Sequence, residues 1–194
     1  MPKTVSLLLF PEVEVLDFAG PFEVLSVANE IDGKNRLALS IVAPNSAPVA
    51  ARNGLRIVPD HSLESCPSSD ILVIPGGFGT RALLLQPEVI EWGQQRAATA
   101  EIVFSICTGS LLLAKAGLLD GLTVTTHHSA LGHLAKLAPH STIDPSQRFH
   151  DNGKFITAAG ISAGIDAALH LAARLFDSEV VAKTLREMEY TPQK

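Results

Sequence analysis

The segment from residue 102 to residue 113 constrains the fold of this chain most, because it passes from a buried strand to a helix within a few residues. Residues 102–104 (Ile-Val-Phe) are typical of a buried strand. Residues 111–116 are typical of a helix that packs on that strand. The turn between them reads Ser-Ile-Cys-Thr-Gly-Ser, with Cys107 at its apex. The segment therefore predicts a strand, a sharp turn and a helix that together present one thiol.

The turn around Cys107 has the small-residue spacing of a nucleophile elbow. In the G-x-S-x-G elbow of α/β-hydrolases, small residues two positions before and after the nucleophile let a strained turn close. Ser105 and Gly109 occupy those positions here. The N–H groups at the start of the next helix are expected to lower the pKa of the thiol and make it reactive. The alternative is an inert core cysteine, because cysteine is among the most buried residue types.

Predicted strands and helices alternate along most of the chain. Apolar runs that predict strands cover residues 5–10, 37–43, 71–74, 102–104 and 122–126. Helical patterns cover residues 17–29, 88–98, 111–116, 130–137, 161–176 and 178–188, the last with Ser178 as its N-cap. Two-strand turns are predicted around residues 53–54 and 151–153. This order predicts an α/β fold, with a mainly parallel sheet covered by helices on both faces, as one domain over residues 1–194.

Three of the predicted strands are followed by residues that can do chemistry. Asp17 follows the first strand, Gly76 and Gly77 follow the third, and Cys107 follows the fourth. Ligand sites in open α/β sheets form outside these carboxyl ends. Asp17 is either a surface helix cap or, if it lies under the elbow, a buried proton donor with a raised pKa. The two glycines either offer N–H groups to an anionic intermediate or form a turn that requires glycine.

A second glycine pattern, residues 77–82 (Gly-Phe-Gly-Thr-Arg-Ala), matches the dinucleotide fingerprint G-x-G-x-x-A. The fingerprint requires an acidic residue at the end of the next strand. Glu101 lies at about the right distance but begins that strand. The pattern also lies well inside the sheet sequence instead of in its first unit. We therefore do not predict nucleotide binding.

The seven histidines do not form a recognisable metal or triad pattern. No H-E-x-x-H or C-x-x-C spacing is present, and none of the histidines is followed two residues later by Glu. The first absence argues against a metal site, and the second argues against the Cys-His-Glu triad of glutamine amidotransferases. His127 and His128 follow a predicted strand end, so one of them is expected to face the site. We predict no metal and no organic cofactor.

Charge and cysteine usage restrict the partners and the compartment. The formal net charge is −5 and no basic cluster occurs, which argues against nucleic acid or an anionic membrane as a partner. The N-terminal segment lacks the apolar region of a signal peptide, which predicts a cytoplasmic protein. Two cysteines, Cys66 and Cys107, do not suggest a disulfide framework. A small-molecule substrate fits these properties.

The chain resembles the ThiJ/PfpI superfamily over nearly its whole length. The matching segments are residues 8–25 (LLFPEVEVLDFAGPFEVL), 74–80 (IPGGFGT), 105–121 (SICTGSLLLAKAGLLDG), 125–128 (TTHH) and 162–171 (SAGIDAALHL). The resemblance implies a flavodoxin-like, doubly wound domain related to glutamine amidotransferases, with a cysteine on a tight elbow. It also implies a homodimer.

Within this superfamily, the D-x-x-G-P motif at residues 17–21 and the Cys-Thr-Gly elbow look like isonitrile hydratases. They look equally like the ligand-binding domains of AraC-type regulators, although no DNA-binding module is expected in a chain that ends at Lys194. Thr108 stands where the peptidase branch carries His, which argues against protease activity. His128 replaces the Trp of the T-T-H-W motif, a change expected to alter the pocket or add a titratable group.

The resemblance to isonitrile hydratases implies a mechanism. Cys107 attacks the terminal carbon of an isonitrile, Asp17 donates a proton to it, and water then releases an N-substituted formamide. Thr108 is expected to hold the sulfur or the water, with Gly77 and neighbouring amides supporting anionic stages. Two alternatives remain open: a non-catalytic or redox-responsive sensor, since exposed cysteines of low pKa oxidise readily, and a glyoxalase or deglycase that acts on 2-oxoaldehydes.

Overall fold

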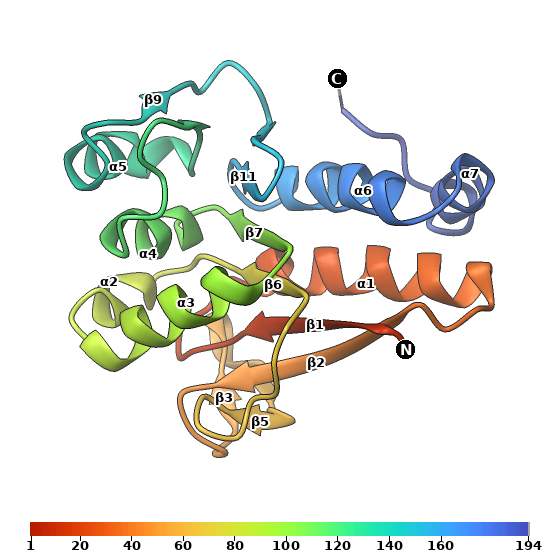
Figure 1. Cartoon of the computed structure of the whole chain (residues 1–194), viewed down its shortest axis with the longest axis horizontal. Coiled ribbons are helices and arrows are strands. Elements are labelled where there is room, and N and C mark those ends of the chain that lie inside the picture. Colours follow the sequence, from red (N-terminus) through yellow and green to blue (C-terminus); the bar gives the residue numbers. More distant parts are fainter. Residues whose placement is uncertain (194) are drawn as a thin grey trace.

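The central sheet carries the elbow and the predicted site residues. The computed structural model describes residues 1–193; Lys194, the last residue of the predicted domain, lies outside the described residues. Seven strands form this sheet within residues 1–193 (Figure 1). In spatial order they are β5 (His61–Ser62), β2 (Leu37–Ala43), β1 (Lys3–Leu8), β6 (Ile71–Ile74), β7 (Ile102–Ile106), β11 (Phe155–Ala158) and β10 (Phe149–Asp151).

The sheet is parallel except at one edge, where β10 pairs antiparallel with β11. Its central strands β6 and β7 are buried along their whole length, which explains why they appear in the sequence as short continuous apolar runs. From β1 the chain moves outward to β2, whereas from β6 it moves in the opposite direction to β7 and then β11. The reversal between β1 and β6 confirms the predicted doubly wound, mainly parallel architecture.

Helices cover both faces of the sheet, as predicted. Their bounds are α1 (Val15–Asp32), α2 (Thr80–Leu83), α3 (Pro87–Thr99), α4 (Gly109–Lys115), α5 (Leu131–Leu137), α6 (Ala163–Leu175) and α7 (Ser178–Glu187). Right-handed crossovers that run in opposite directions along a sheet place their helices on opposite faces. Accordingly, α1 packs against α6 and α7, while α3 packs against α4 and α4 against α5 (Figure 1).

Short elements outside the central sheet complete the fold. The predicted turn around residues 53–54 is present between β3 (Val49–Ala50) and β4 (Arg56–Ile57), which pair antiparallel. The strand expected at residues 122–126 shortens to β8 (Thr123–Val124) and pairs with β9 (Thr142–Ile143) instead of joining the central sheet. Two short 3₁₀ turns cover Arg52–Gly54 and His128–Ala130.

Two predicted helix boundaries are wrong. Ser178 is the first residue of α7 and not its N-cap, which is Asp177. Helix α1 begins at Val15, so Asp17 lies inside its first turn and does not cap it. The N-cap of α1 is Glu14, whose side chain makes no capping hydrogen bond, so the sequence lacks the Ser, Thr, Asp or Asn signal that usually marks a helix start.

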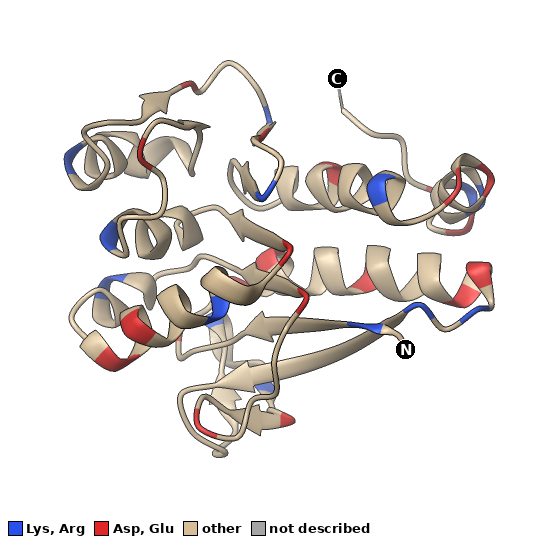
Figure 2. Cartoon of the chain, in the orientation of Figure 1, with Lys and Arg blue, Asp and Glu red and all other residues tan. Residues whose placement is uncertain are grey.

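The charged residues are interspersed over the molecule (Figure 2). Lys and Arg do not gather on one element, in keeping with the net charge of −5. No helix within residues 1–193 is both long enough and apolar enough to span a membrane.

Candidate active site

Three strand ends meet at the point where the winding of the sheet reverses. β1 leads to α1 and Asp17, β6 leads to Gly76, and β7 leads to Cys107. Because β1, β6 and β7 are neighbouring parallel strands, these residues lie at the same edge of the sheet. Ligands of open α/β sheets bind at such a reversal. The fold therefore brings Asp17, Gly76, Gly77, Cys107 and Thr108 together.

Cys107 occupies the sharp turn between β7 and α4 in a left-handed backbone conformation, with φ of +55°. A residue other than glycine pays ~1–3 kcal/mol for this conformation. The turn is held by hydrogen bonds from the Cys107 N–H to the carbonyl oxygens of Ala158, at 3.1 Å, and Ala159, at 2.9 Å. These bonds tie the elbow to the end of the neighbouring strand β11, so the strained turn is maintained by the sheet.

The start of α4 passes very close to the end of β6. A Cβ atom on Gly109 would collide with the carbonyl oxygen of Ile74, so a side chain there would push the helix away from the sheet. Ser105, two residues before the cysteine, is fully buried. The small residues on either side of the cysteine are therefore required by packing, as the elbow pattern predicts.

The carbonyl of Cys107 is anchored by two hydroxyl groups. Thr126 Oγ1 donates to this oxygen at 2.8 Å, and Ser110 Oγ donates at 3.2 Å. Sequence reasoning included Thr126 in the T-T-H-H segment but gave it no role. The contact between Thr126 and the elbow joins residues 19 positions apart, so it leaves no local pattern in the sequence.

Asp17 lies beneath the elbow with no exposed surface. Its Oδ2 accepts a hydrogen bond from the Gly76 N–H at 3.0 Å, while its buried Oδ1 has no hydrogen-bond partner among the described residues. Burial raises the pKa of Asp17 to about 7, although the Gly76 N–H acts in the opposite direction. Of the two alternatives for Asp17, the surface cap is wrong, and a buried carboxyl that titrates near neutrality is present.

The thiol of Cys107 also has a raised pKa, of about 12. Burial is the main cause, and the negative charge of Asp17 adds to it, whereas the Thr108 N–H lowers the pKa. The prediction that the start of α4 lowers the pKa of the thiol is therefore wrong here. Cys107 is only 6% exposed and its thiol faces a carboxyl group, and both conditions raise the pKa. The neutral thiol is the resting form.

Gly77, Thr80 and Thr108 form a connected hydrogen-bond network. The Gly77 N–H donates to Thr108 Oγ1 at 3.0 Å, and Thr108 Oγ1 lies 2.7 Å from Thr80 Oγ1. The Thr108 hydroxyl also approaches the Gly77 carbonyl at 3.2 Å. With the Gly76 N–H already bound to Asp17, neither glycine N–H is free for a substrate anion in this structure. This network holds the loop that follows β6 against the elbow.

A pocket of about 210 Å³ opens above Cys107. It is lined by Glu14, Arg52, Gly77, Phe78, Arg81, Cys107, Thr108, His127, Ser129 and Ile161. Sequence reasoning identified Gly77, Cys107, Thr108 and His127 but not the other six. Five of these, Glu14, Phe78, Arg81, Ser129 and Ile161, lie within or next to segments that carry the family resemblance, whereas Arg52 comes from the β3–β4 hairpin.

Only the first of the two adjacent histidines lines the pocket. His127 Nδ1 accepts a hydrogen bond from the Ser129 N–H at 3.3 Å, so we assign the ring proton to Nε2. Burial, followed by the charge of His128, lowers the pKa of His127, which therefore carries a neutral ring. His128 is exposed and packs against it with ring centroids 4.2 Å apart.

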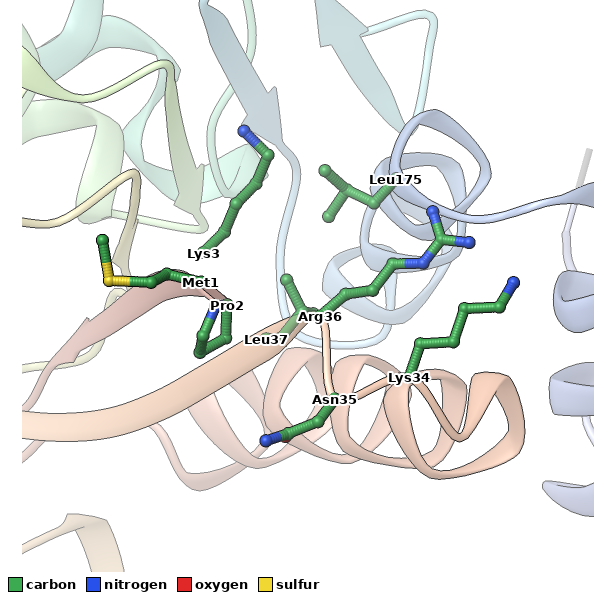
Figure 3. Close-up of a pocket in the computed structure, with 8 residues that line it drawn as sticks. All are labelled: Met1, Pro2, Lys3, Lys34, Asn35, Arg36, Leu37 and Leu175. Carbon is green, nitrogen blue, oxygen red and sulfur yellow. The ribbon is translucent and has the colours of Figure 1, made fainter.

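A second pocket, of about 500 Å³, lies at the opposite end of the parallel strands (Figure 3). Lys3, Lys34 and Arg36 line it, together with apolar residues such as Leu37 and Leu175. Its cations are paired: Lys3 with Glu101, at 2.5 Å, and Arg36 with Asp32, at 2.9 Å. Among the described residues, no Cys, Ser, Thr or His lines this pocket, so the predicted nucleophile lies in the other pocket, the one above Cys107.

No metal ligand set accompanies the thiol. Within residues 1–193, no three His, Cys, Asp or Glu side chains come close enough together to hold a metal ion. Cys66, the second cysteine, is buried near Ser6, with 3.8 Å between Sγ and Oγ, and does not line the pocket. The site therefore consists of a thiol, a buried carboxyl, a neutral imidazole, two arginines and the carboxylate of Glu14, which pairs with one of them.

Several known proteins are similar to this chain in sequence and fold. The chain is 34% identical over 192 residues to an isonitrile hydratase of Pseudomonas putida. The aligned region covers 99% of this chain and 80% of the hydratase. It is 28% identical to the HTH-type transcriptional regulator GbdR of Pseudomonas aeruginosa, of which it spans 49%. A crystal structure of a ThiJ/PfpI family protein from Pseudomonas syringae superimposes on this chain with a TM-score of 0.89 and 31% identity. The match covers all of this chain and 77% of the chain in that crystal structure. Residues 3–174 match the profile of the DJ-1/PfpI family. The chain therefore belongs to the DJ-1/PfpI family, also called ThiJ/PfpI.

Proposed function

We propose that this protein hydrates a small isonitrile to an N-substituted formamide, with Cys107 as nucleophile and Asp17 as proton carrier. The observation that carries the proposal is the buried Asp17 carboxyl, which faces the thiol and has its pKa raised to about 7. Such a group can both give and take a proton at neutral pH. The similarity to an isonitrile hydratase supports the same reaction.

In the first step, the thiol adds across the terminal carbon of the isonitrile. The sulfur of Cys107 forms a bond to this carbon, which is both electrophilic and basic. Asp17 gives its proton to the same carbon, and the proton of the thiol returns to Asp17. The product is a thioimidate, R–N=CH–S–Cys107, with no change in total charge. Because the thiol keeps its proton until attack, its raised pKa of about 12 is compatible with this step.

In the second step, water adds to the thioimidate carbon. Asp17 gives its proton to the nitrogen and takes one from the water, which leaves a tetrahedral carbon that bears a hydroxyl group. The C–S bond then breaks, the hydroxyl becomes a carbonyl, and its proton passes through Asp17 to the sulfur. The products are the formamide R–NH–CHO and the free thiol, so each turnover consumes one water molecule.

The surrounding residues position these two groups. The Gly76 N–H holds one Asp17 oxygen, leaving the other for proton transfer. Thr108 binds the loop after β6 through its hydroxyl, and both its N–H and its hydroxyl lower the pKa of the sulfur, which supports a role for Thr108 in holding the sulfur. Since neither Gly76 nor Gly77 has a free N–H, their proposed role is to position Asp17 and Thr108. The neutral Nε2–H of His127 is suited to donate to the substrate or to water.

The first test measures formamide production from a simple alkyl isonitrile. Cys107→Ala should abolish turnover, because no other thiol lines the pocket. Cys66→Ala is the matched control, since it removes a buried cysteine outside the pocket, and should retain activity within about threefold of wild type. Turnover by Cys107→Ala would contradict nucleophilic catalysis.

A second variant tests the proton carrier. Asp17→Asn preserves the shape of the side chain but removes the proton, so kcat/KM should fall by ~100-fold or more. Activity within about threefold of wild type would eliminate this role for Asp17. If wild type gives no formamide at all, methylglyoxal consumption and the intact mass after peroxide treatment would test the glyoxalase and sensor alternatives.

A further inference from the structure

The pocket above Cys107 has an uneven distribution of charge. Its ionised lining residues are Glu14, Arg52 and Arg81. Arg52 Nη1 and Glu14 Oε2 form an ion pair at 2.9 Å, so these two charges offset each other. His127 is neutral because burial lowers its pKa. One positive charge, that of Arg81, therefore remains without compensation in the pocket wall.

Arg81 is held at the rim but lacks an acidic partner. Its guanidinium carbon lies 5.0 Å from the centre of the Phe78 ring, and its Nη1 is 3.5 Å from the Gly77 carbonyl oxygen. Among residues 1–193, no carboxylate lies within ion-pair distance of it. A guanidinium that stacks on an aromatic ring still has hydrogen-bond donors along its edge, and these match the two oxygens of a carboxylate.

The ring beneath this arginine is itself unusual. Phe78 is 65% exposed at the mouth of the pocket, where a large apolar side chain gains little from burial. The Phe78 ring contacts the guanidinium through a cation–π interaction, which restricts the positions of the Arg81 side chain. The charge of Arg81 also contributes to the lowered pKa of His127, after burial and His128, so its field reaches another residue that lines the pocket.

We propose that Arg81 binds a carboxylate on the substrate, so that the preferred substrate is a small isonitrile bearing a carboxylate group. This inference rests on the proposed function and names its substrate class. The pocket volume of about 210 Å³ is below the ~300–1,000 Å³ of sites for drug-sized ligands, which favours a short molecule. One end of the substrate meets Cys107 and the other meets Arg81 at the rim.

The test uses a series of isocyano carboxylates with one to four methylene groups between the isonitrile and the carboxylate. The turnover of each carboxylate is compared with the turnover of its methyl ester. Wild type should show a kcat/KM for the best carboxylate that exceeds that of its ester by ~10-fold or more, as expected for a charge-assisted hydrogen bond. In Arg81→Gln this ratio should fall by ~10-fold or more. Lys115→Gln removes one positive charge from an exposed position outside the pocket and should leave the ratio unchanged.

A second measurement does not depend on hydration. The alkylation rates of Cys107 by iodoacetate and by iodoacetamide are compared by peptide mass spectrometry, since these reagents differ in charge but share a leaving group. The ratio of the iodoacetate rate to the iodoacetamide rate should be ~10-fold lower in Arg81→Gln than in wild type.

The two measurements separate the possible failures. Hydration of the esters without any preference for carboxylates, together with an alkylation ratio that Arg81→Gln does not change, overturns the inference and leaves the proposed function standing. Absence of hydration together with an alkylation ratio that depends on Arg81 overturns the hydratase function and supports anion recognition. Absence of hydration together with an alkylation ratio that does not depend on Arg81 overturns both.

Discussion

Cys107 and Asp17 occupy one buried environment in which each group affects the protonation of the other. A negative charge on Asp17 raises the pKa of the thiol, and burial raises the pKa of both groups. The thiol therefore keeps its proton at neutral pH, whereas Asp17 exchanges its proton there and is the first of the two to lose it as pH rises. A nucleophile that stays protonated until it meets its substrate resists oxidation, because the thiolate is the readily oxidised form.

The pH dependence of activity follows from the protonation of Asp17. Because the proposed first step needs a protonated Asp17, kcat/KM should decrease as pH rises through its pKa of about 7, by ~10-fold per unit beyond it. The measurement is a profile of formamide production between pH 5 and pH 9, corrected for hydration without enzyme. A rate that increases up to pH 9 would indicate attack by a thiolate and would contradict this mechanism.

The same carboxyl group should limit stability. The pKa of Asp17 rises from 3.8 to about 7 on folding, so between these values the folded state keeps a proton that the unfolded state has lost. The stability from this proton is complete below pH ~4 and is lost as pH rises through about 7. Asp17→Asn cannot ionise, so it does not lose this stability as pH rises. The free energy of unfolding of Asp17→Asn relative to wild type should therefore be ~2–3 kcal/mol higher at pH 8 than at pH 5.

Urea unfolding at the two pH values would measure this difference. Asp120→Asn serves as the control because it removes an exposed carboxyl group, and it should change the free energy of unfolding by less than ~0.5 kcal/mol. Equal gains for Asp17→Asn at pH 5 and pH 8 would show that Asp17 does not carry a raised pKa.

At the scale of elements, the elbow depends on the contact between α4 and β6. Gly109 lies where the helix backbone meets the Ile74 carbonyl, and Cys107 lies in the turn that this contact closes. The same turn is tied to β11 through the Cys107 N–H and to the segment after β8 through Thr126. The position of the thiol is therefore set by several elements together and not by the elbow sequence alone.

Two glycine substitutions separate helix propensity from this contact. Gly109→Ala should destabilise the protein by ~2–3 kcal/mol and displace Cys107, because the added methyl group collides with the backbone of β6. Gly93→Ala in α3 has open space around the new methyl group and should stabilise the protein by ~0.5–1 kcal/mol. Thermal unfolding of both variants checks the prediction, and a destabilised Gly93→Ala or a stable, active Gly109→Ala would contradict it.

At the scale of the whole molecule, the pocket faces the carboxyl edge of the sheet and the paired cations occupy the opposite end. Several large apolar side chains remain exposed within residues 1–193, among them Leu55 and Val58 around the β3–β4 hairpin. Exposed apolar surface is typical of interaction sites when it is contiguous. It is compatible with the homodimer that the family resemblance implies.

Light scattering tests the homodimer. We expect a particle of twice the 20.6 kDa chain mass, and dilution should eventually convert it to the monomer. A 20.6 kDa particle at every concentration would contradict the prediction. The measurement uses wild-type protein, and Cys107→Ala is a suitable control because it leaves the exposed apolar side chains unchanged.

The sequence by itself determined the parallel sheet, the order of its main helices and the elbow at Cys107. These features leave local signals: continuous apolar runs for buried strands, helical periodicity, and small residues on either side of the cysteine. It also identified Asp17 and the glycine pair, because residues after parallel strands converge at one edge of a sheet. It left open whether Asp17 caps a helix or lies under the elbow.

Only the tertiary structure decided the electrostatics of the site. The raised pKa values of Cys107 and Asp17 arise because residues ninety positions apart in the sequence are buried against each other. The unpaired charge of Arg81 likewise becomes evident only when the Glu14–Arg52 ion pair is seen on the same pocket wall. Desolvation and charge pairing depend on distance in space, which local sequence patterns do not encode.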